Sequence, residues 1–293
     1  TYLAFLRYAF DPETRRFRNF LGFDRRWAKG LASEDCHGRA IWALGICLGR
    51  SRSKAFHNLA GWLFEQALPL VPDFSSPRAW AFTIIGIHEY LRRFSGDRYA
   101  HQLRETLSDK LFGLWKRQSS PDWPWFEPGL SYSNAKLPLA LIMSGRWLGN
   151  GDMLKAGLSA LDWLARIQTS PKKCFRPVGT EGFDQKGGAI AAFDQQPVEA
   201  YAMVCACLEA YRTTKDERWY REARSAFQWL LGRNDLNVSL YDPVTGGCRD
   251  ALHIDRVNQN EGAESTLAFH LALTEMHAME NTLASLKEPL TEA

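Results

Sequence analysis

The sequence of 293 residues lacks several features that would point to particular classes of protein. No apolar run reaches the roughly 18 residues that cross a bilayer, so a membrane-spanning helix is not expected. The 36 Lys and Arg residues against 33 Asp and Glu give a net charge of only +3. So small and evenly spread a charge does not suggest nucleic-acid binding. The chain opens on Thr1 and has no basic-then-apolar segment of the kind that directs secretion.

Cysteine is scarce and follows no paired pattern. The six residues form no CxxC motif, which argues against a disulfide scaffold and against common zinc sites. Four of them lie in helix-like apolar segments: Cys36, Cys47, Cys205 and Cys207. We therefore expect free, buried thiols in a reducing compartment and assign the chain to the cytoplasm.

The best-known catalytic motifs are also missing. The seven histidines form no HExxH motif, and no GxSxG, Walker A or GxGxxG sequence occurs. The segment around Asp242-Pro243 is typical of a turn, and its spacing is not that of a calcium-binding EF-hand. The sequence thus predicts no cofactor and no metal.

What the sequence does contain is apolar patterning with the period of an α-helix. No alternating run is long enough to predict a substantial sheet. We therefore expect an all-α protein, with helices near 1–9, 36–49, 53–68, 78–94, 97–116, 134–147, 151–168, 196–213, 216–231 and 262–282.

The connections between these helices are of two kinds. Short turns that carry an Asp able to cap the next helix include Gly96-Asp97, Gly151-Asp152 and Lys215-Asp216. Long stretches rich in Gly, Pro and aromatic residues lead into the helices near 36, 78, 134, 196 and 262. Long irregular connections in compact domains are often functional, so the ends of the helices at these long loops are the place to look for a site.

A repeated tryptophan supports the same organisation. The helix after each short turn carries a Trp towards its end, at Trp62, Trp115, Trp163 and Trp229. A helical-hairpin repeat of this length predicts a solenoid or a closed ring. We predict one domain, 1–293, with an α/α-toroid fold built of helical hairpins. A closed ring of six hairpins has two helices more than predicted here, so we expect the first hairpin to lie before Thr1.

Polar residues gather where the long loops enter the helices. Amides, acids and Arg beside aromatic side chains suit a ligand with many hydroxyls and apolar ring faces, such as a sugar. We predict that a glycan is bound by His37, Arg39, Arg78, Trp123, Trp125, Asn134, Glu181, Gln195, Gln196, Glu199, Glu261 and Glu264.

Cleavage of a glycosidic bond usually requires two carboxyl groups, one to protonate the leaving oxygen and one to activate water or attack. Glu127 is the leading acid candidate, because its apolar neighbours in Trp125-Phe126-Glu127 favour a protonated carboxyl. Asp35 and Asp194 are the candidate bases. Each of these two residues also lies where a helix cap is expected, and the sequence does not separate capping from catalysis.

Several of these segments together resemble a known protein region. Ser33-Glu34-Asp35-Cys36-His37-Gly38-Arg39, Phe193-Asp194-Gln195-Gln196-Pro197-Val198-Glu199 and Gln259-Asn260-Glu261-Gly262-Ala263-Glu264 are its clearest segments. They resemble an α/α-toroid region of bacterial proteins often labelled glycosyltransferases, where it follows a nucleotide-sugar-dependent domain. The architecture is more distantly similar to six-hairpin glycosidases. The resemblance spans nearly the whole chain, and it implies a toroid but no residue-level mechanism.

Three functional hypotheses follow. The first is a glycoside hydrolase-like enzyme acting on an oligosaccharide or glycan. The second is a non-catalytic glycan-binding or scaffolding module that serves a glycosyltransferase domain or subunit as its partner. The third is a protein-interaction solenoid, which predicts an exposed apolar groove in place of polar helix entrances.

Overall fold

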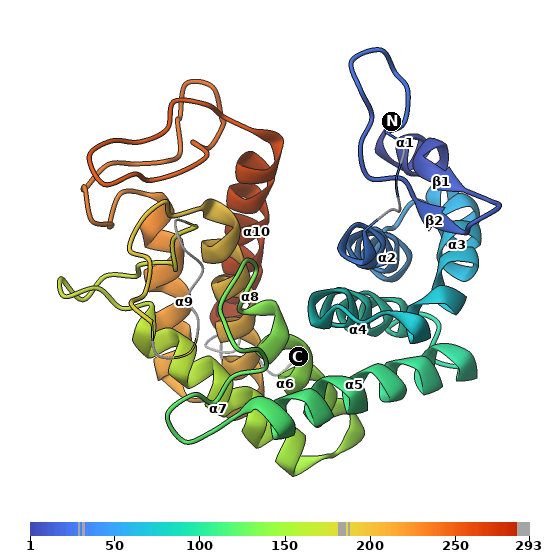
Figure 1. The fold of residues 1–293 in the computed structure, drawn as a ribbon, viewed down its shortest axis with the longest axis horizontal. Helices are drawn as coiled ribbons and strands as arrows, with labels where there is room; N and C mark the ends of the chain where they lie inside the picture. The colour runs from blue at the N-terminus through green and yellow to red at the C-terminus, as the bar shows by residue number, and fades with distance from the viewer. Residues whose placement is uncertain (29, 31–32, 181–185, 187, 286–293) are drawn as a thin grey trace, which may run out of the picture. The chain divides into compact units, whose positions relative to one another are not determined.

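The computed structural model describes residues 1–293 except 29, 31–32, 181–185, 187 and 286–293 (Figure 1). The chain divides into two compact units. Unit 1 contains Thr1–Arg117 and Met143–Leu154, and unit 2 contains Gln118–Ile142 and Lys155–Ala293. Each unit is described separately below. Whether the chain behaves as the single domain expected from the repeat stays a prediction.

About 60% of the chain is helical, and long irregular segments make up most of the remainder. The elements are α1 (Tyr2–Ala9), β1 (Phe10–Asp11), β2 (Arg16–Phe17), α2 (Glu34–Arg50), α3 (Lys54–Ala67), the 3₁₀ helix η1 (Leu68–Asp73), α4 (Pro77–Leu91), α5 (Arg98–Gln118), α6 (Lys136–Leu148), α7 (Gly151–Ile167), α8 (Pro197–Thr214), α9 (Glu217–Leu230) and α10 (Ala263–Ser285). The predicted all-α class is confirmed, and each predicted helix agrees with an observed one to within a few residues. Within the described residues, no helix is both long and apolar enough to cross a membrane.

The small sheet and the 3₁₀ helix η1 are elements that the sequence did not predict. β1 and β2 form an antiparallel pair in which Phe10 lies opposite Phe17. Both rings are buried, and their centroids lie 5.2 Å apart. Two strands of two residues are too short for an alternating pattern to be visible in a sequence.

The turns between paired helices follow the predicted capping in part. Asp97 and Asp216 cap α5 and α9 by accepting a hydrogen bond from a main-chain N–H in the first turn. At α7 the expected cap is wrong, because Asn150 accepts from the N–H of Met153 at 3.0 Å while Asp152 lies inside the helix. The carboxylate of Asp152 still favours the positive end of the helix dipole from that position.

Unit 1 is built around the packing of α2 on α4 (Figure 1). The two helices approach so closely that a Cβ on Gly45 of α2 would overlap the main chain of Gly86 in α4. Only residues without a side chain permit this contact, and both helices carry glycine there.

We expect Gly45→Ala to destabilise the protein by about 2–3 kcal/mol, because the methyl group forces the packed backbones apart. Gly61→Ala on α3 is the matched control, since its Cβ would have only Leu48 Cδ2 nearby at 3.9 Å. The control should be neutral or stabilising by up to about 1 kcal/mol. Urea unfolding of both variants measures this difference in the free energy of unfolding. Equal stability of the two variants would show that α2 and α4 do not pack as closely at Gly45 as described.

Unit 2 has α8 at its centre, packed against α9 and α10 (Figure 1). Nearly all of α8 is buried from Pro197 to Tyr211, as expected of a helix that is apolar on every side. α9 is amphipathic instead. Its inner face buries Trp219, Ala223 and Trp229, and its outer face is polar and rich in arginine. An ion pair of 2.6 Å between Arg218 and Asp162 connects α9 to α7.

Candidate functional site

The acids at the start of α2 hold the start of α4 within unit 1. Glu34 Oε2 accepts hydrogen bonds from the main-chain N–H groups of Ser75 and Ser76, at 2.8 and 2.7 Å. Asp35 Oδ1 accepts from the hydroxyl of Ser76 at 2.5 Å. Asp35 is not the N-cap of α2, because Ser33 Oγ fills that position. The predicted role of Asp35 as a catalytic base stays a prediction, and its observed contact joins two helix entrances.

Glu199 plays the same part in unit 2. This buried residue of α8 accepts hydrogen bonds from the main-chain N–H groups of Ser133 and Asn134, which precede α6. The side-chain amide of Asn134 donates to the same carboxylate at 3.2 Å and to the carbonyl of Ser131 at 3.1 Å. A carboxylate therefore satisfies the unpaired N–H groups at the start of the neighbouring helix in both units. Glu199 and Asn134, predicted to bind substrate, have observed contacts that fix the loop before α6.

Two other predicted site residues of unit 1, His37 and Arg39, are packed against aromatic rings. His37 is fully buried between Phe17 and Phe74, and its Nε2 lies 3.0 Å from the carbonyl oxygen of Ala67. Burial lowers the pKa of His37 to about 4, so the ring is neutral at pH 7. The guanidinium of Arg39 lies 4.6 Å from the ring centroid of Phe82.

Arg78 lies in the first turn of α4 and is only 4% exposed. A buried guanidinium at a helix entrance is compatible with either a structural or a ligand-binding role. The predicted glycan contacts of His37, Arg39 and Arg78 stay predictions.

The loop before α6 contains the aromatic candidates. Trp125 is 0% exposed and packs against Trp163, with ring centroids 5.5 Å apart. Trp123 is half-buried, packs on the same Trp163, and donates from Nε1 to the carbonyl oxygen of Glu127 at 2.8 Å. The two rings thus hold the loop in place, and of the two only Trp123 has solvent-exposed surface. Glu127 is itself half-buried directly after this anchored segment.

Gln195 lies in a buried network in front of α8. Its side chain accepts from Trp229 Nε1 at 2.8 Å and donates to Asp235 Oδ2 at 2.9 Å. Arg176 binds the same carboxylate with two nitrogens, at 2.9 and 2.5 Å. Burial alone would raise the pKa of Asp235, but the hydrogen bonds from Arg176 and Gln195 bring it below its usual value. These contacts anchor Gln195 within the fold, and its predicted glycan contact stays a prediction. The adjacent Gln196 is half-buried at the N-cap position of α8.

Next to this anchor the structure brings Asp194 and His253 together. Nδ1 of His253 lies 3.0 Å from Oδ1 of Asp194, and Thr180 donates its hydroxyl to the other carboxylate oxygen at 3.1 Å. Among the described residues Asp194 Oδ1 has no hydrogen-bond partner, so the two side chains form a close contact at ion-pair distance without a hydrogen bond of good geometry. Main-chain hydrogen bonds between Gln195 and Leu252 hold the two segments in register.

A cavity of about 300 Å³ adjoins this pair. It is lined by Ala191, Ala192, Phe193, His253, Ile254, Asp255 and Arg256. Ala192 and Phe193 give it apolar surface, whereas His253 and Arg256 supply hydrogen-bonding groups. An Asp–His pair at a half-open cavity is an arrangement that can transfer protons to and from a bound molecule.

Two of the remaining candidates, Glu261 and Glu264, lie just before and just inside the start of α10. Glu261 forms an ion pair of 3.3 Å with Arg249 and accepts from the hydroxyl of Thr245 at 2.8 Å. Glu264 is exposed in the first turn of α10. Glu181 lies outside the described residues. Among the residues that the structure describes, no three His, Cys, Asp or Glu side chains group in a way that could hold a metal ion.

His253 is the residue that sequence reasoning missed. It lies in the irregular segment between α9 and α10, away from the helix-entrance motifs on which the prediction concentrated. The only local indication of a functional role was the presence of a His next to charged residues, in His253-Ile254-Asp255-Arg256. The contact with Asp194 depends on the pairing of two loops far apart in sequence.

Comparison with known proteins was made by sequence and by structure. No protein-family model matches this sequence, and no match is found among curated proteins. Several solved structures are similar. A heparin-specific unsaturated glucuronyl hydrolase aligns with a TM-score of 0.58 and 13% sequence identity. The alignment covers 78% of this chain and 64% of the hydrolase chain.

Two further structures illustrate the range of activities among these neighbours. The cellobiose 2-epimerase of Spirochaeta thermophila has a TM-score of 0.70 and 14% identity, over 95% of this chain and 78% of that one. The GH76 α-mannanase of Bacteroides thetaiotaomicron has a TM-score of 0.60 and 10% sequence identity. That alignment covers 84% of this chain and 69% of the mannanase chain. These similarities establish the α/α-toroid fold class that the sequence predicted.

Proposed function

We propose that this chain is a carbohydrate-active enzyme whose acid–base group is the Asp194–His253 pair. The observation that carries the proposal is the 3.0 Å contact between Asp194 Oδ1 and His253 Nδ1 beside a cavity. The fold supports a sugar as substrate, since a glucuronyl hydrolase, an epimerase and a mannanase share it. The fold alone does not assign a reaction, so the chemistry must be argued from the residues.

The first candidate reaction is cleavage of a glycosidic bond. In this scheme Glu127 protonates the leaving oxygen, while Asp194 accepts the proton of an attacking water. Most other acids predicted at the helix entrances have structural contacts, as Asp35, Glu199 and Glu261 show. Glu127 and Asp194 are the two acids in unit 2 that we assign to catalysis.

Sugar positioning in this proposal falls to side chains with exposed surface in unit 2. The ring of Trp123 offers an edge for the apolar face of a sugar, and Gln196 offers an amide. Arg256 of the cavity provides charge-assisted hydrogen bonds to hydroxyl or carboxylate groups of the substrate.

The Asp–His pair also favours a second candidate, an epimerase or isomerase. Asp194 orients His253 so that Nε2 can remove a proton from a sugar carbon next to a carbonyl group and return it. Hydrolysis does not require a histidine in this role, so the presence of His253 is the specific reason to consider it.

One experiment separates the two reactions. The purified chain is incubated in D₂O with a panel of oligosaccharides and reducing sugars, and products are followed by NMR and mass spectrometry. Hydrolysis releases new reducing ends without incorporation of deuterium at carbon, whereas epimerisation or isomerisation incorporates deuterium at the carbon that loses its proton. His253→Gln should abolish epimerisation or isomerisation, and Glu127→Gln should abolish hydrolysis.

The same experiment also tests the hypothesis of a glycan-binding module. If sugars bind, as measured by calorimetry, and none is converted, the enzyme proposal is wrong. The chain would then serve a separate enzyme, such as the glycosyltransferase domain or subunit expected from the sequence resemblance. Glu127→Gln would leave glycan binding intact in that case.

A further inference from the structure

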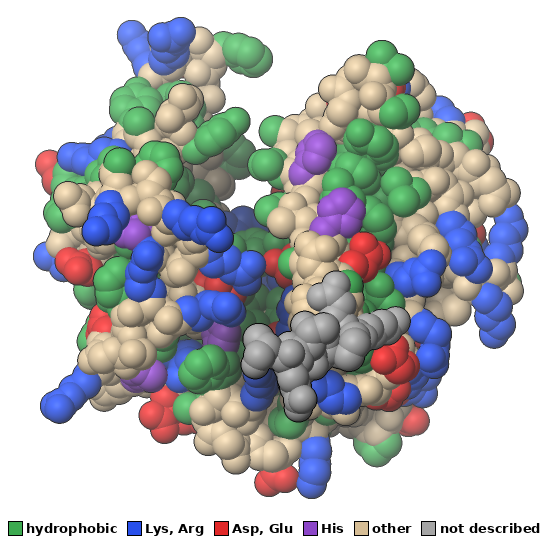
Figure 2. Space-filling view, turned by 180° about the vertical axis from the view of Figure 1, so that it is seen from behind, with side chains coloured by type: hydrophobic (Ala, Val, Ile, Leu, Met, Phe, Trp, Pro, Cys, Tyr) green, Lys and Arg blue, Asp and Glu red, His purple; other side chains and the backbone are tan. Residues whose placement is uncertain are grey.

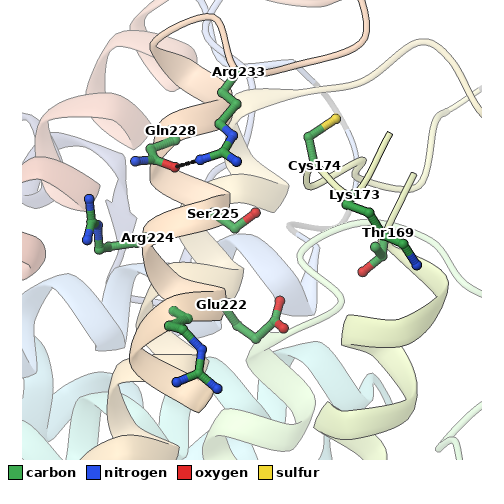
Figure 3. A pocket seen from close by; sticks show the side chains of 9 residues that line it. Thr169, Lys173, Cys174, Glu222, Arg224, Ser225, Gln228 and Arg233 are labelled. Atoms are coloured by element: carbon green, nitrogen blue, oxygen red, sulfur yellow. Dashed lines mark hydrogen bonds between the residues drawn. The ribbon is translucent and has the colours of Figure 1, made fainter. Parts of the chain in front are cut away.

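A second cavity in unit 2 lies beside α9, and none of the residues proposed for catalysis lines it. Its volume is about 470 Å³, and it is lined by Thr169, Lys173, Cys174, Arg221, Glu222, Arg224, Ser225, Gln228 and Arg233. None of these residues lines the cavity beside His253. The cavity lies between α9 and the segment that follows α7 (Figure 3).

The charge around this cavity is concentrated and mostly positive. Four of its nine lining side chains are cationic, against the single carboxylate of Glu222. On the face shown in Figure 2, charged side chains of both signs occur. The chain as a whole carries a net charge of only +3, so this excess is local.

Helical spacing brings the groups from α9 together. Arg221, Ser225 and Gln228 lie at i, i+4 and i+7, which places them on one face of the helix. Arg233 donates to the amide oxygen of Gln228 at 3.1 Å, which fixes its guanidinium over the same face (Figure 3). Lys173 approaches from the opposite wall. These side chains are exposed or half-buried, so they are accessible to a ligand.

The wall formed by α9 also carries a carboxylate and a hydroxyl group, from Glu222 and Ser225. In Figure 3 Glu222 and Ser225 point from α9 towards the segment that carries Cys174. Glu222 is half-buried, and burial raises its pKa while the nearby Arg218 and Arg221 lower it. An anionic ligand in this cavity would be attracted by the Arg and Lys side chains and repelled by one carboxylate, that of Glu222. Mutation of Glu222 removes the repulsion and leaves the four cationic side chains in place.

We propose that this cavity is a binding site for an oxyanion, the phosphate or sulfate ester of a small molecule. Arginine is the side chain best suited to such groups, because its planar fork donates two hydrogen bonds to adjacent oxygens. The volume of the cavity accommodates a sugar ring that carries one such ester. The inference does not depend on the reaction proposed above, since no residue is shared.

Titration calorimetry with inorganic phosphate, inorganic sulfate and glucose 6-phosphate at fixed ionic strength tests this site. Free glucose is the uncharged probe and should not bind here. The double variant Arg221→Gln with Arg233→Gln should weaken binding of the anions at least about tenfold, as expected for lost charge-assisted hydrogen bonds. Glu222→Gln should strengthen it about threefold, the size expected from removing one screened unit charge at short range.

The matched control is the double variant Arg52→Gln with Arg98→Gln, which removes the same charge from exposed positions of unit 1. It should leave the affinity within about twofold of the wild type. Equal weakening in both double variants would show a general charge effect and overturn the proposal. Absence of phosphate, sulfate and glucose 6-phosphate binding by the wild type would overturn it as well.

Discussion

Asp194→Asn is expected to lower kcat/KM on the sugar that the wild type converts by about 10³ to 10⁴-fold. An amide in place of the carboxylate cannot stabilise the positively charged imidazole. It can also turn its NH₂ group towards Nδ1 of His253, and the contact that orients the ring in this proposal is then lost. Steady-state kinetics measure the loss. The free energy of unfolding should change little, because the pair is half-buried and Thr180 can still hydrogen-bond to an amide oxygen.

Asp122→Asn is the control for this result, because Asp122 is an exposed carboxylate of the same unit. Its kcat/KM should stay within about twofold of the wild type. If Asp194→Asn is as active as this control, neither Asp194 as a base nor the Asp194–His253 pair takes part in the reaction. The pair would then be a contact that joins two loops.

The second large effect concerns stability. Glu199→Ala is expected to lower the free energy of unfolding by about 3 kcal/mol or more. The mutation leaves the main-chain N–H groups of Ser133 and Asn134 buried without their acceptor, and each such group costs about 1–3 kcal/mol. Urea unfolding at pH 7 gives the difference. Glu199→Gln keeps one acceptor oxygen and should have an intermediate stability.

The control for the buried cap is Glu264→Ala, which removes an acid from the first turn of α10 where the side chain is exposed. That loss should be below about 1 kcal/mol, the usual size of a helix-dipole effect. A Glu199→Ala protein as stable as Glu264→Ala would show that the start of α6 does not need the carboxylate from α8.

The helices were predictable because their signal is local. An amphipathic helix such as α9 repeats its apolar residues every three or four positions, and a short turn such as the one at Asp97 carries its own capping residue. The tryptophan repeat then suggested hairpins, and the solved structures confirm the fold class.

The candidate site was less predictable because its contacts are between distant segments. Glu199 and Asn134 are 65 residues apart, so the sequence could not show that the acid caps another helix. Tryptophans were equally ambiguous: Trp125, predicted to face a ligand, is 0% exposed, whereas Trp62 of the packing repeat is 39% exposed. Composition and spacing identify residue types near a helix end, and only the packing of neighbouring loops determines which of them reach solvent.

The most direct test of the account is a crystal structure of the Asp194→Asn protein with the sugar that the wild type converts. The account predicts a sugar ring in the cavity beside His253, with a reacting carbon or oxygen about 3 Å from Nε2 of that histidine. A sugar bound at another place on the chain, with this cavity empty, would contradict the assignment of Asp194 and His253 to the reaction.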